Sequence, residues 1–291
     1  MIKIHLNKTL ALIGALALAA SISACNKNVA VIGGADGPTN VIVSGAEKNK
    51  SVSDALGEAV LSFNEGGYLS CECRGEGHII IDTEKSGDDT VVYAVVSYGE
   101  YGFEDGNFIK VSGLGATPVK AEEKTRGAYV DTLIREIEDF EEPEDGAYYE
   151  PSVREIFKKR YSQLESFSKK YDDFGYSQLL GQEKNYAKTY LKSIGREDAK
   201  IGEYGDFEHP LLTEEGVSEE VSNSLLENKE LADYPMWIGS REKVEDGTRY
   251  VYELRFKKGD ENIIYVKHEY GTEEPVETLT FGAKDGKRII E

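Results

Sequence analysis

"VVYAVVSYGEYGFEDGNFIKV", residues 91–111, predicts two β-strands joined by a tight turn. Valine, tyrosine and phenylalanine dominate both arms, and these residue types favour a pleated, half-buried chain. Glu104-Asp105-Gly106 separates the arms with acids, which bond nearby backbone, and a glycine, which tolerates a positive φ. We therefore expect an antiparallel hairpin with arms at residues 91–98 and 108–111.

The sequence on either side of this hairpin predicts one helix and further strands. Ser51 is a good N-cap with an acid three residues on, and apolar residues then recur at helical spacing as far as Phe63. Residues 78–83 and 130–137 are also rich in strand-forming types. We expect residues 51–150 to form an N-terminal α+β lobe in which one helix precedes an antiparallel sheet.

Helical spacing replaces the β pattern in residues 151–233. Pro151 fits a first helical turn, and apolar residues recur at helical spacing over 153–164 and 186–194, which could pack as a hairpin. A short helix is expected at 218–231. Residues 234–291 then alternate strand-like runs with turn residues, which predicts a C-terminal antiparallel sheet lobe of four strands. The expected fold class is α+β, with two antiparallel sheet lobes and a helical middle section.

Residues 1–24 have the pattern of a lipoprotein signal peptide. Lys3 and Lys8 precede an apolar run that ends in small residues, and this run is shorter than the roughly 20 residues of a membrane-spanning helix. Ile22-Ser23-Ala24-Cys25 resembles a bacterial lipobox. That resemblance implies a diacylglycerol on Cys25, which would hold the protein outside the cell by membrane lipid. An ordinary cleavage site with an incidental cysteine is the alternative.

The composition excludes some classes of partner. The chain has 34 Lys+Arg against 54 Asp+Glu, a net charge of −20. This charge disfavours nucleic acid, anionic lipid and teichoic acid, but it allows metal cations or a basic protein surface. Cys71 and Cys73 are expected to be thiols, because a zinc site needs about four ligands at ordered spacings and the histidines show none. We expect no metal and no cofactor.

Motifs for catalysis are also missing. The sequence has no Gly-x-Ser-x-Gly or His-Glu-x-x-His pattern, and no catalytic residue is predicted. The leading hypothesis is a non-enzymatic binding or sensory accessory protein, and the alternative is a cell-envelope hydrolase with an acidic active site. Aromatic residues near turns are the candidate contacts for a ligand or partner, with core packing as the alternative: Tyr98, Tyr101, Phe103, Tyr148, Tyr149 and Trp237.

"GGADGPT", residues 33–39, resembles the signature of the membrane β subunit of sodium-pumping biotin decarboxylases. The resemblance does not imply that this protein pumps ions, because no transmembrane helices are predicted around the GGADGPT segment. Residues 25–50 are expected to comprise the lipid anchor, a hairpin and a tether, with residues 31–43 docking on a membrane protein. A flexible spacer is the alternative. The docking loop comprises Gly33, Gly34, Asp36, Gly37, Pro38 and Thr39.

A longer resemblance spans much of residues 75–256. Its most distinctive stretches include "GEGHIIIDTE" and "YPMWIGSREKVEDGTRYVYELRF". They are similar to uncharacterised clostridial surface lipoproteins, and to the extracytoplasmic regions that accompany membrane metallopeptidases of the β-lactam-sensor type. The resemblance implies a surface sensor or binding accessory without catalysis.

The lipid anchor can be tested by metabolic labelling with a fatty-acid analogue. The wild-type protein should be labelled and Cys25→Ser should not, because the thiol is the acceptor of the diacylglycerol. Equal labelling of the two proteins would refute the anchor.

Overall fold

The computed structural model describes residues 51–290, apart from 70, 88 and 129–131, and two short strands near the N-terminus. These strands, β1 (Val31–Ile32) and β2 (Asn40–Val41), pair antiparallel, with Val31 opposite Val41. Residues 31–32 therefore pair with residues 40–41, within the segment where a hairpin is expected. The predicted lipidation residue and the predicted docking loop lie outside the described residues: Cys25, Gly33, Gly34, Asp36, Gly37, Pro38 and Thr39.

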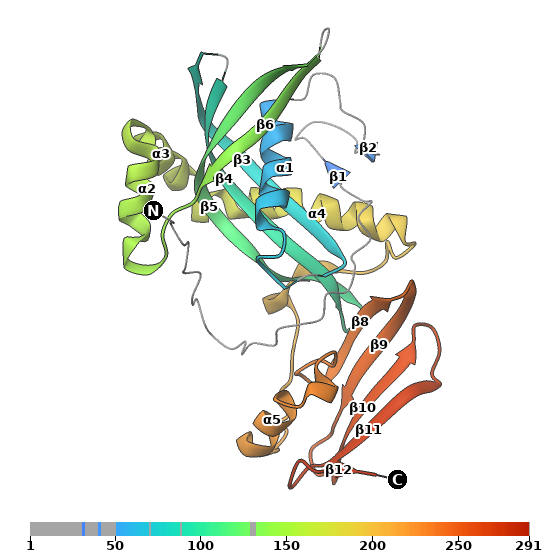
Figure 1. Cartoon of the computed structure of the whole chain (residues 1–291). Helices are drawn as coiled ribbons and strands as arrows, with labels where there is room; N and C mark the ends of the chain where they lie inside the picture. Colours follow the sequence, from blue (N-terminus) through green and yellow to red (C-terminus); the bar gives the residue numbers. More distant parts are fainter. Residues whose placement is uncertain are drawn as a thin grey trace, which may run out of the picture.

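A long antiparallel sheet forms the larger lobe (Figure 1). Its strands, in spatial order, are β3 (Cys73–Ser86), β4 (Asp89–Glu104), β5 (Asn107–Ala128) and β6 (Thr132–Glu141). The predicted hairpin is β4–β5, and its turn uses positive φ at Asp105 (47°) and Gly106 (72°). A short strand, β7 (Ile201–Glu203), adds to β5 in parallel. The expected α+β class is confirmed.

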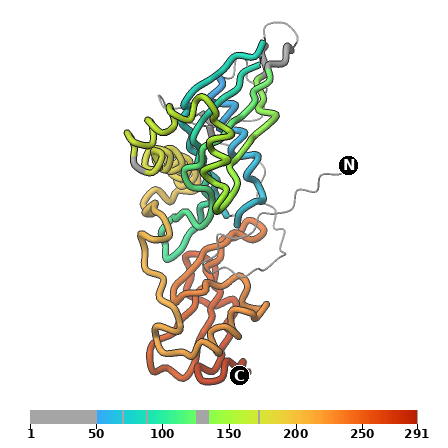
Figure 2. The backbone as a smooth tube through the Cα atoms, turned by 90° about the vertical axis from the view of Figure 1, so that its left-hand side faces the viewer, coloured from blue at the N-terminus to red at the C-terminus, as the bar shows by residue number. Residues whose placement is uncertain are grey.

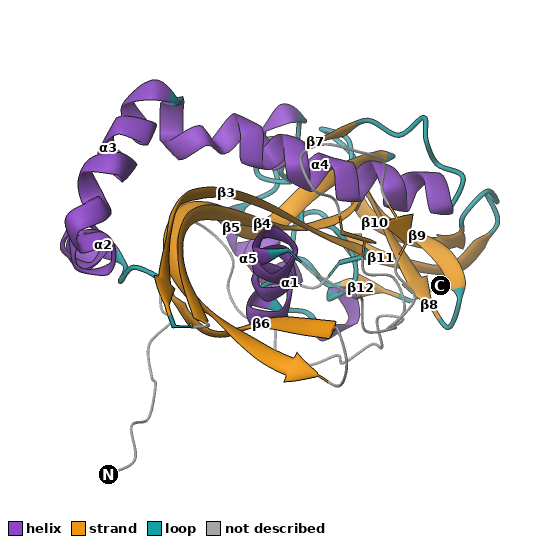
Figure 3. Ribbon diagram, turned by 90° about the horizontal axis from the view of Figure 1, so that it is seen from above, coloured by secondary structure: helices purple, strands orange, loops and turns teal. Residues whose placement is uncertain are grey.

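Helices cover both faces of this sheet (Figure 3). α1 (Val52–Asn64) lies inside the curve, where Leu56 and Val60 pack on one set of β4 residues. α2 (Tyr149–Phe157), α3 (Tyr161–Lys170) and α4 (Tyr176–Ser193) lie outside it and pack on the alternate set. β4 is therefore buried on both faces. No helix in the described part of the chain is long and apolar enough to cross a membrane.

α4 approaches β3 unusually closely. A Cβ added to Gly77 would lie 2.5 Å from the carbonyl oxygen of Leu179, and one added to Gly75 would lie 2.9 Å from that of Glu183. Only a residue without a side chain fits such positions. The Gln182 side chain then accepts from the His78 backbone N–H at 2.9 Å and donates to its carbonyl at 3.1 Å, which covers this part of the β3 edge.

Several sequence predictions need correction. The strands run longer than expected, because β-bulges let β4 and β5 continue through glycines. The single helix expected over 153–164 is broken at Lys158, whose φ is +47°. After the break, the Arg160 guanidinium forms ion pairs with two acids of β3: its Nε lies 2.7 Å from Oδ2 of Asp82, and its Nη2 lies 2.6 Å from Oε2 of Glu84. The middle helices pack on the sheet and not as a hairpin.

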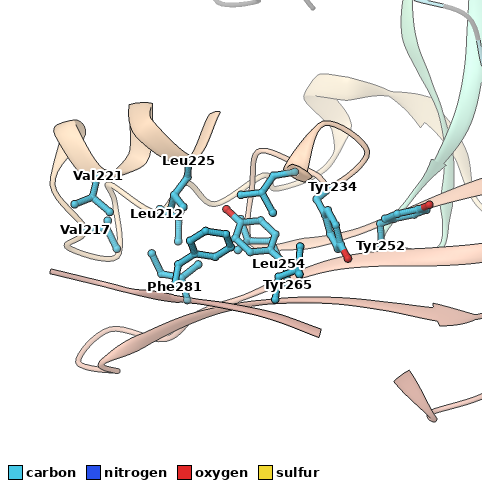
Figure 4. Close-up of a cluster of buried hydrophobic side chains, with 12 residues drawn as sticks. Leu212, Val217, Val221, Leu225, Tyr234, Tyr252, Leu254, Tyr265 and Phe281 are labelled. Carbon is cyan, nitrogen blue, oxygen red and sulfur yellow. The ribbon is translucent and has the colours of Figure 1, made fainter. Parts of the chain in front are cut away.

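The C-terminal lobe is the predicted meander behind one helix. α5 (Glu219–Leu226) begins after its N-cap Ser218. The strands are β8 (Gly239–Glu245), β9 (Thr248–Arg255), β10 (Asn262–Glu269), β11 (Pro275–Gly282) and the short β12 (Arg288–Ile289). Tyrosines, leucines and Phe281 fill the space between helix and sheet (Figure 4). Short 3₁₀ turns lie at Gly146–Tyr148, Lys158–Arg160, Asp172–Gly175, Tyr204–Asp206 and Lys229–Leu231.

The two lobes meet end to end (Figure 2). Glu104, the last residue of β4, pairs with Arg241 of β8, so the two meanders form one continuous sheet. The buried carboxylate of Glu104 also accepts from Arg241 at 3.2 Å and bonds His209 at 3.0 Å. Asp105 adds a 2.6 Å bond from the Ser240 backbone N–H.

The close approach of α4 to β3 can be tested with glycine substitutions. Gly77→Ala should destabilise the protein by about 1–3 kcal/mol, because the added methyl group overlaps the α4 backbone. Gly115→Ala in β5 is the matched control, since its Cβ would meet nothing within 4 Å. Urea unfolding measures both, and equal midpoints would contradict the packing described.

Candidate functional site

Most of the aromatic residues predicted as ligand contacts lie in the core. Tyr98, Tyr101, Phe103 and Trp237 are at most 2% exposed, so packing is the role that the structure shows for them. Tyr98 faces α1, while Tyr101 and Phe103 face the opposite side of β4 with α4 residues. Tyr149 is half-buried at the start of α2. Of the six, only Tyr148 is well exposed, at 67%.

A different group of side chains has the geometry of a reactive site. The Oγ atom of Ser53 lies 2.5 Å from Nε2 of His78. The other ring nitrogen of His78, Nδ1, lies 2.8 Å from Oε2 of Glu76. A hydroxyl, an imidazole and a carboxylate hydrogen-bonded in this order form the nucleophile, base and orienting acid of serine-type acyl transfer.

The local sequence explains why these groups meet. Side chains alternate along a strand, so Glu76 and His78 share one face of β3, while Gly75 and Gly77 face α4. Ser53 lies in the first turn of α1, and Gly57 lies one turn later. A Cβ on Gly57 would lie 2.7 Å from Oε1 of Glu76, so the glycine lets α1 approach the carboxylate.

The carboxylate of Glu76 is held at both oxygens. It is only 1% exposed, and Tyr186 of α4 donates its hydroxyl to Oε1 at 2.8 Å while Oε2 meets His78. Gln182 of α4 also fixes the His78 backbone. The imidazole is therefore oriented both by Glu76 of its own strand, β3, and by α4. Such support is what an orienting acid needs, since a loosely held imidazole would lose its alignment with the hydroxyl.

The charges around His78 favour its protonated form. Burial alone would lower the pKa of His78, but the hydrogen bond and charge of Glu76, together with the charge of Asp54, raise it above its ordinary value. We assign the Nδ1 proton to the bond with Glu76, which leaves Nε2 to accept from Ser53. Ser53 can then pass its proton to His78.

The first turn of α1 offers donors for a developing negative charge. The Asp54 N–H is used by Ser51 Oγ at 3.1 Å, and the Ala55 N–H by the Ser51 carbonyl. The N–H groups of Val52 and Ser53 have no acceptor within the described residues. Free N–H groups at a helix N-terminus stabilise anions, including the oxyanion of a tetrahedral intermediate.

Glu183 is a buried carboxylate with a cationic partner. Glu183 is bound by Lys110 at 3.0 Å and by the Tyr101 hydroxyl at 3.1 Å. Cys71 and Cys73 are half-buried thiols, and burial, followed by nearby Glu100, raises the pKa of Cys71 far above its usual range, which makes it a poor nucleophile. Among the described residues, no group of three or more His, Cys, Asp or Glu could hold a metal ion.

Comparison with known proteins assigns neither a family nor a function to the chain. No family model, curated protein or solved structure matches the chain. The site is therefore judged on its geometry alone, and the resemblances found in the sequence stay predictions.

Sequence motifs could not reveal this site, because its residues follow no known motif. The available signal was "GEGH" at 75–78, where an acid and a histidine alternate with glycines at the start of an apolar strand. That pattern places two polar side chains on one face and leaves the opposite face open to close packing.

The raised pKa of His78 can be measured by NMR titration of its ring protons. It should lie above the ordinary value of about 6.5. The stability that comes from protonated His78 is then complete below pH ~6.5 and is lost as pH rises through the raised pKa. Glu76→Gln should lower the pKa, because burial remains while the favourable charge is gone.

Glu227→Gln, which removes an acid beyond the end of α5, is the control and should leave the pKa of His78 unchanged. A pKa that does not respond to Glu76→Gln would show that the two side chains are not coupled.

Proposed function

We propose that this protein is a serine-type hydrolase of the cell envelope, acting by acyl transfer through Ser53. The observation that carries the proposal is the hydrogen-bonded series Ser53–His78–Glu76, with spacings of 2.5 and 2.8 Å. The sequence left a cell-envelope hydrolase with an acidic site as its alternative hypothesis. The geometry favours that alternative, with Glu76 as the acidic member.

The residues have distinct roles in the reaction. His78 takes the proton of the Ser53 hydroxyl as Oγ attacks the acyl carbon, and the N–H groups at the start of α1 stabilise the oxyanion. The leaving group departs with the proton from His78. Water then attacks the acyl-serine, again through His78, and regenerates the hydroxyl. Glu76 holds the imidazole in the correct tautomer and stabilises its cation.

The site would work at the outer face of the membrane. The lipobox-like sequence at Cys25 supports attachment to membrane lipid, and this attachment remains a proposal. Ser51, the N-cap of α1, follows the segment that would carry the anchor. The nucleophile would therefore be tethered close to substrates at the cell surface.

A second candidate is the binding or sensory accessory function that the sequence favours. It is supported by the pairing of β1 with β2 and by the position of β1 beside α1 and α4 (Figure 1). Residues 31–43 would then dock on a membrane protein, with no catalytic step. Covalent labelling of Ser53 separates the two candidates, because only an activated serine reacts with a fluorophosphonate.

The hydrolase predicts labelling of the purified full-length protein by a fluorophosphonate probe, with phosphorus bonded to Oγ of Ser53 and fluoride released. Ser53→Ala should abolish labelling, and His78→Gln should slow it by about 100- to 10,000-fold, because the general base is lost. Mass spectrometry locates the modified residue.

Ser62→Ala is the matched control on the same helix, since Ser62 bonds the Ala59 carbonyl and does not contact His78. This variant should be labelled like the wild type. A wild-type protein that resists the probe as fully as Ser53→Ala would refute the hydrolase and leave the accessory function as the better proposal.

A further inference from the structure

α4 binds the β3 segment through a row of polar side chains on one face of the helix. Gln182, Tyr186 and Tyr190 follow one another at intervals of four residues, which places them side by side along that face. Gln182 bonds the His78 backbone, and the Tyr186 hydroxyl bonds Glu76 at 2.8 Å. Two members of the row therefore support the proposed catalytic group.

The third member of the row, Tyr190, bonds a carboxylate that is shared with the C-terminal lobe. Its hydroxyl donates to Oε2 of Glu72 at 2.6 Å, and Glu72 directly precedes β3. The Glu72 backbone N–H donates to the Tyr101 carbonyl at 3.0 Å, which fixes this residue to β4. Arg249 of β9 donates to both carboxylate oxygens of Glu72, each at 2.8 Å. The C-terminal lobe thus holds the acid that holds Tyr190.

A second contact joins the segment after α4 to the same arginine. Arg196 donates from both terminal nitrogens to Glu242 of β8, at 3.0 and 3.1 Å. Nη1 of Arg249 lies 3.0 Å from Oε2 of Glu242. The side chains of Glu72, Glu242 and both arginines are at most 16% exposed. Since bidentate pairs of arginine and carboxylate fix orientation as well as distance, the C-terminal lobe holds the end of α4 at two points.

The geometry of a helix transmits this hold to the site. Tyr190 lies one turn, about 5.4 Å along the axis, from Tyr186. Over so short a length a helix moves as one body, so a shift at Tyr190 also shifts Tyr186 and Gln182. Their hydrogen bonds to β3 depend on distance and angle, and the imidazole needs both supports to stay aligned with the Ser53 hydroxyl.

We propose that the C-terminal lobe positions the proposed general base of the larger lobe, with Arg249 as the positioning residue. Arg249 holds Glu72, and Glu72 holds the turn of α4 that follows Tyr186. The inference rests on the proposed hydrolase function and adds a means of regulation to it. A movement of the C-terminal lobe changes the alignment of His78 with Ser53, and with it the rate of acyl transfer.

Tyr190→Phe tests the link, because it removes one hydroxyl and keeps the ion pair between Glu72 and Arg249. The rate at which a fluorophosphonate labels Ser53 in the purified full-length protein should fall about tenfold, because small displacements of reacting groups slow a reaction steeply. Arg249→Gln should slow labelling as well. The double variant should be no slower than the slower single variant, since both changes interrupt the same series of contacts.

Hydrogen exchange separates positioning from a general loss of stability. The His78 amide donates to Gln182, whereas the amides of β4, which is buried on both faces, report global unfolding. The ratio of the His78 exchange rate to the β4 rates should rise about tenfold in Tyr190→Phe and in Arg249→Gln. Arg255→Gln is the matched control, because Arg255 lies on the same strand and pairs with Glu253 of that strand. It should change neither labelling nor this ratio.

The outcomes separate this inference from the function beneath it. A labelled wild type whose Tyr190→Phe and Arg249→Gln variants react at the wild-type rate would overturn the positioning role and leave the hydrolase standing. Slower labelling with an unchanged exchange ratio would also overturn it, because that pattern does not involve the contact of α4 with His78. A wild type that resists the probe would overturn the hydrolase and the positioning role with it.

Discussion

The close packing of α4 on the backbone of β3 determines most of the larger lobe. It requires Gly75 and Gly77, because any side chain there would overlap the helix backbone. Since side chains alternate along a strand, two glycines on one face leave Glu76 and His78 on the other, facing α1. The same approach brings Tyr186 within reach of the buried carboxylate. The close packing of α4 on β3 therefore explains both the position of Glu76 and His78 and the support that α4 gives them.

The chain buries several carboxylates, and each burial has an electrostatic cost that partners must offset. Glu183 is matched by Lys110, and Glu104 by Arg241 with His209, so these pairs stabilise the fold. Glu76 differs from these two carboxylates, because it is bound by the Tyr186 hydroxyl and by His78. The imidazole is thus the partner whose charge can change, which couples the buried carboxylate to proton transfer at the site.

The elements with local signals were predictable. The capping box that starts α1, the turn after β4 and the C-terminal meander all have their determinants within a few residues. The full extent of β5 could not be predicted, because Gly113 and Pro118 are residue types that normally interrupt strands. In the structure both residues pair with β4, which keeps the strand continuous. Tyr98 was predicted as a contact because sequence spacing does not show that α1 covers that face of β4. Ser53 and His78 had no motif, since they meet only through tertiary packing.

The order in which the chain emerges during synthesis also affects how Ser53, His78 and Glu76 are brought together. The contact between Ser53 and His78 closes a separation of 25 residues, whereas Tyr186 reaches Glu76 across 110. By loop-closure entropy the longer contact costs about 1.3 kcal/mol more. It also cannot form until α4 has left the ribosome. The serine and histidine can therefore meet early, but the carboxylate is fixed only when most of the chain has emerged, so full assembly of the site is delayed by vectorial synthesis.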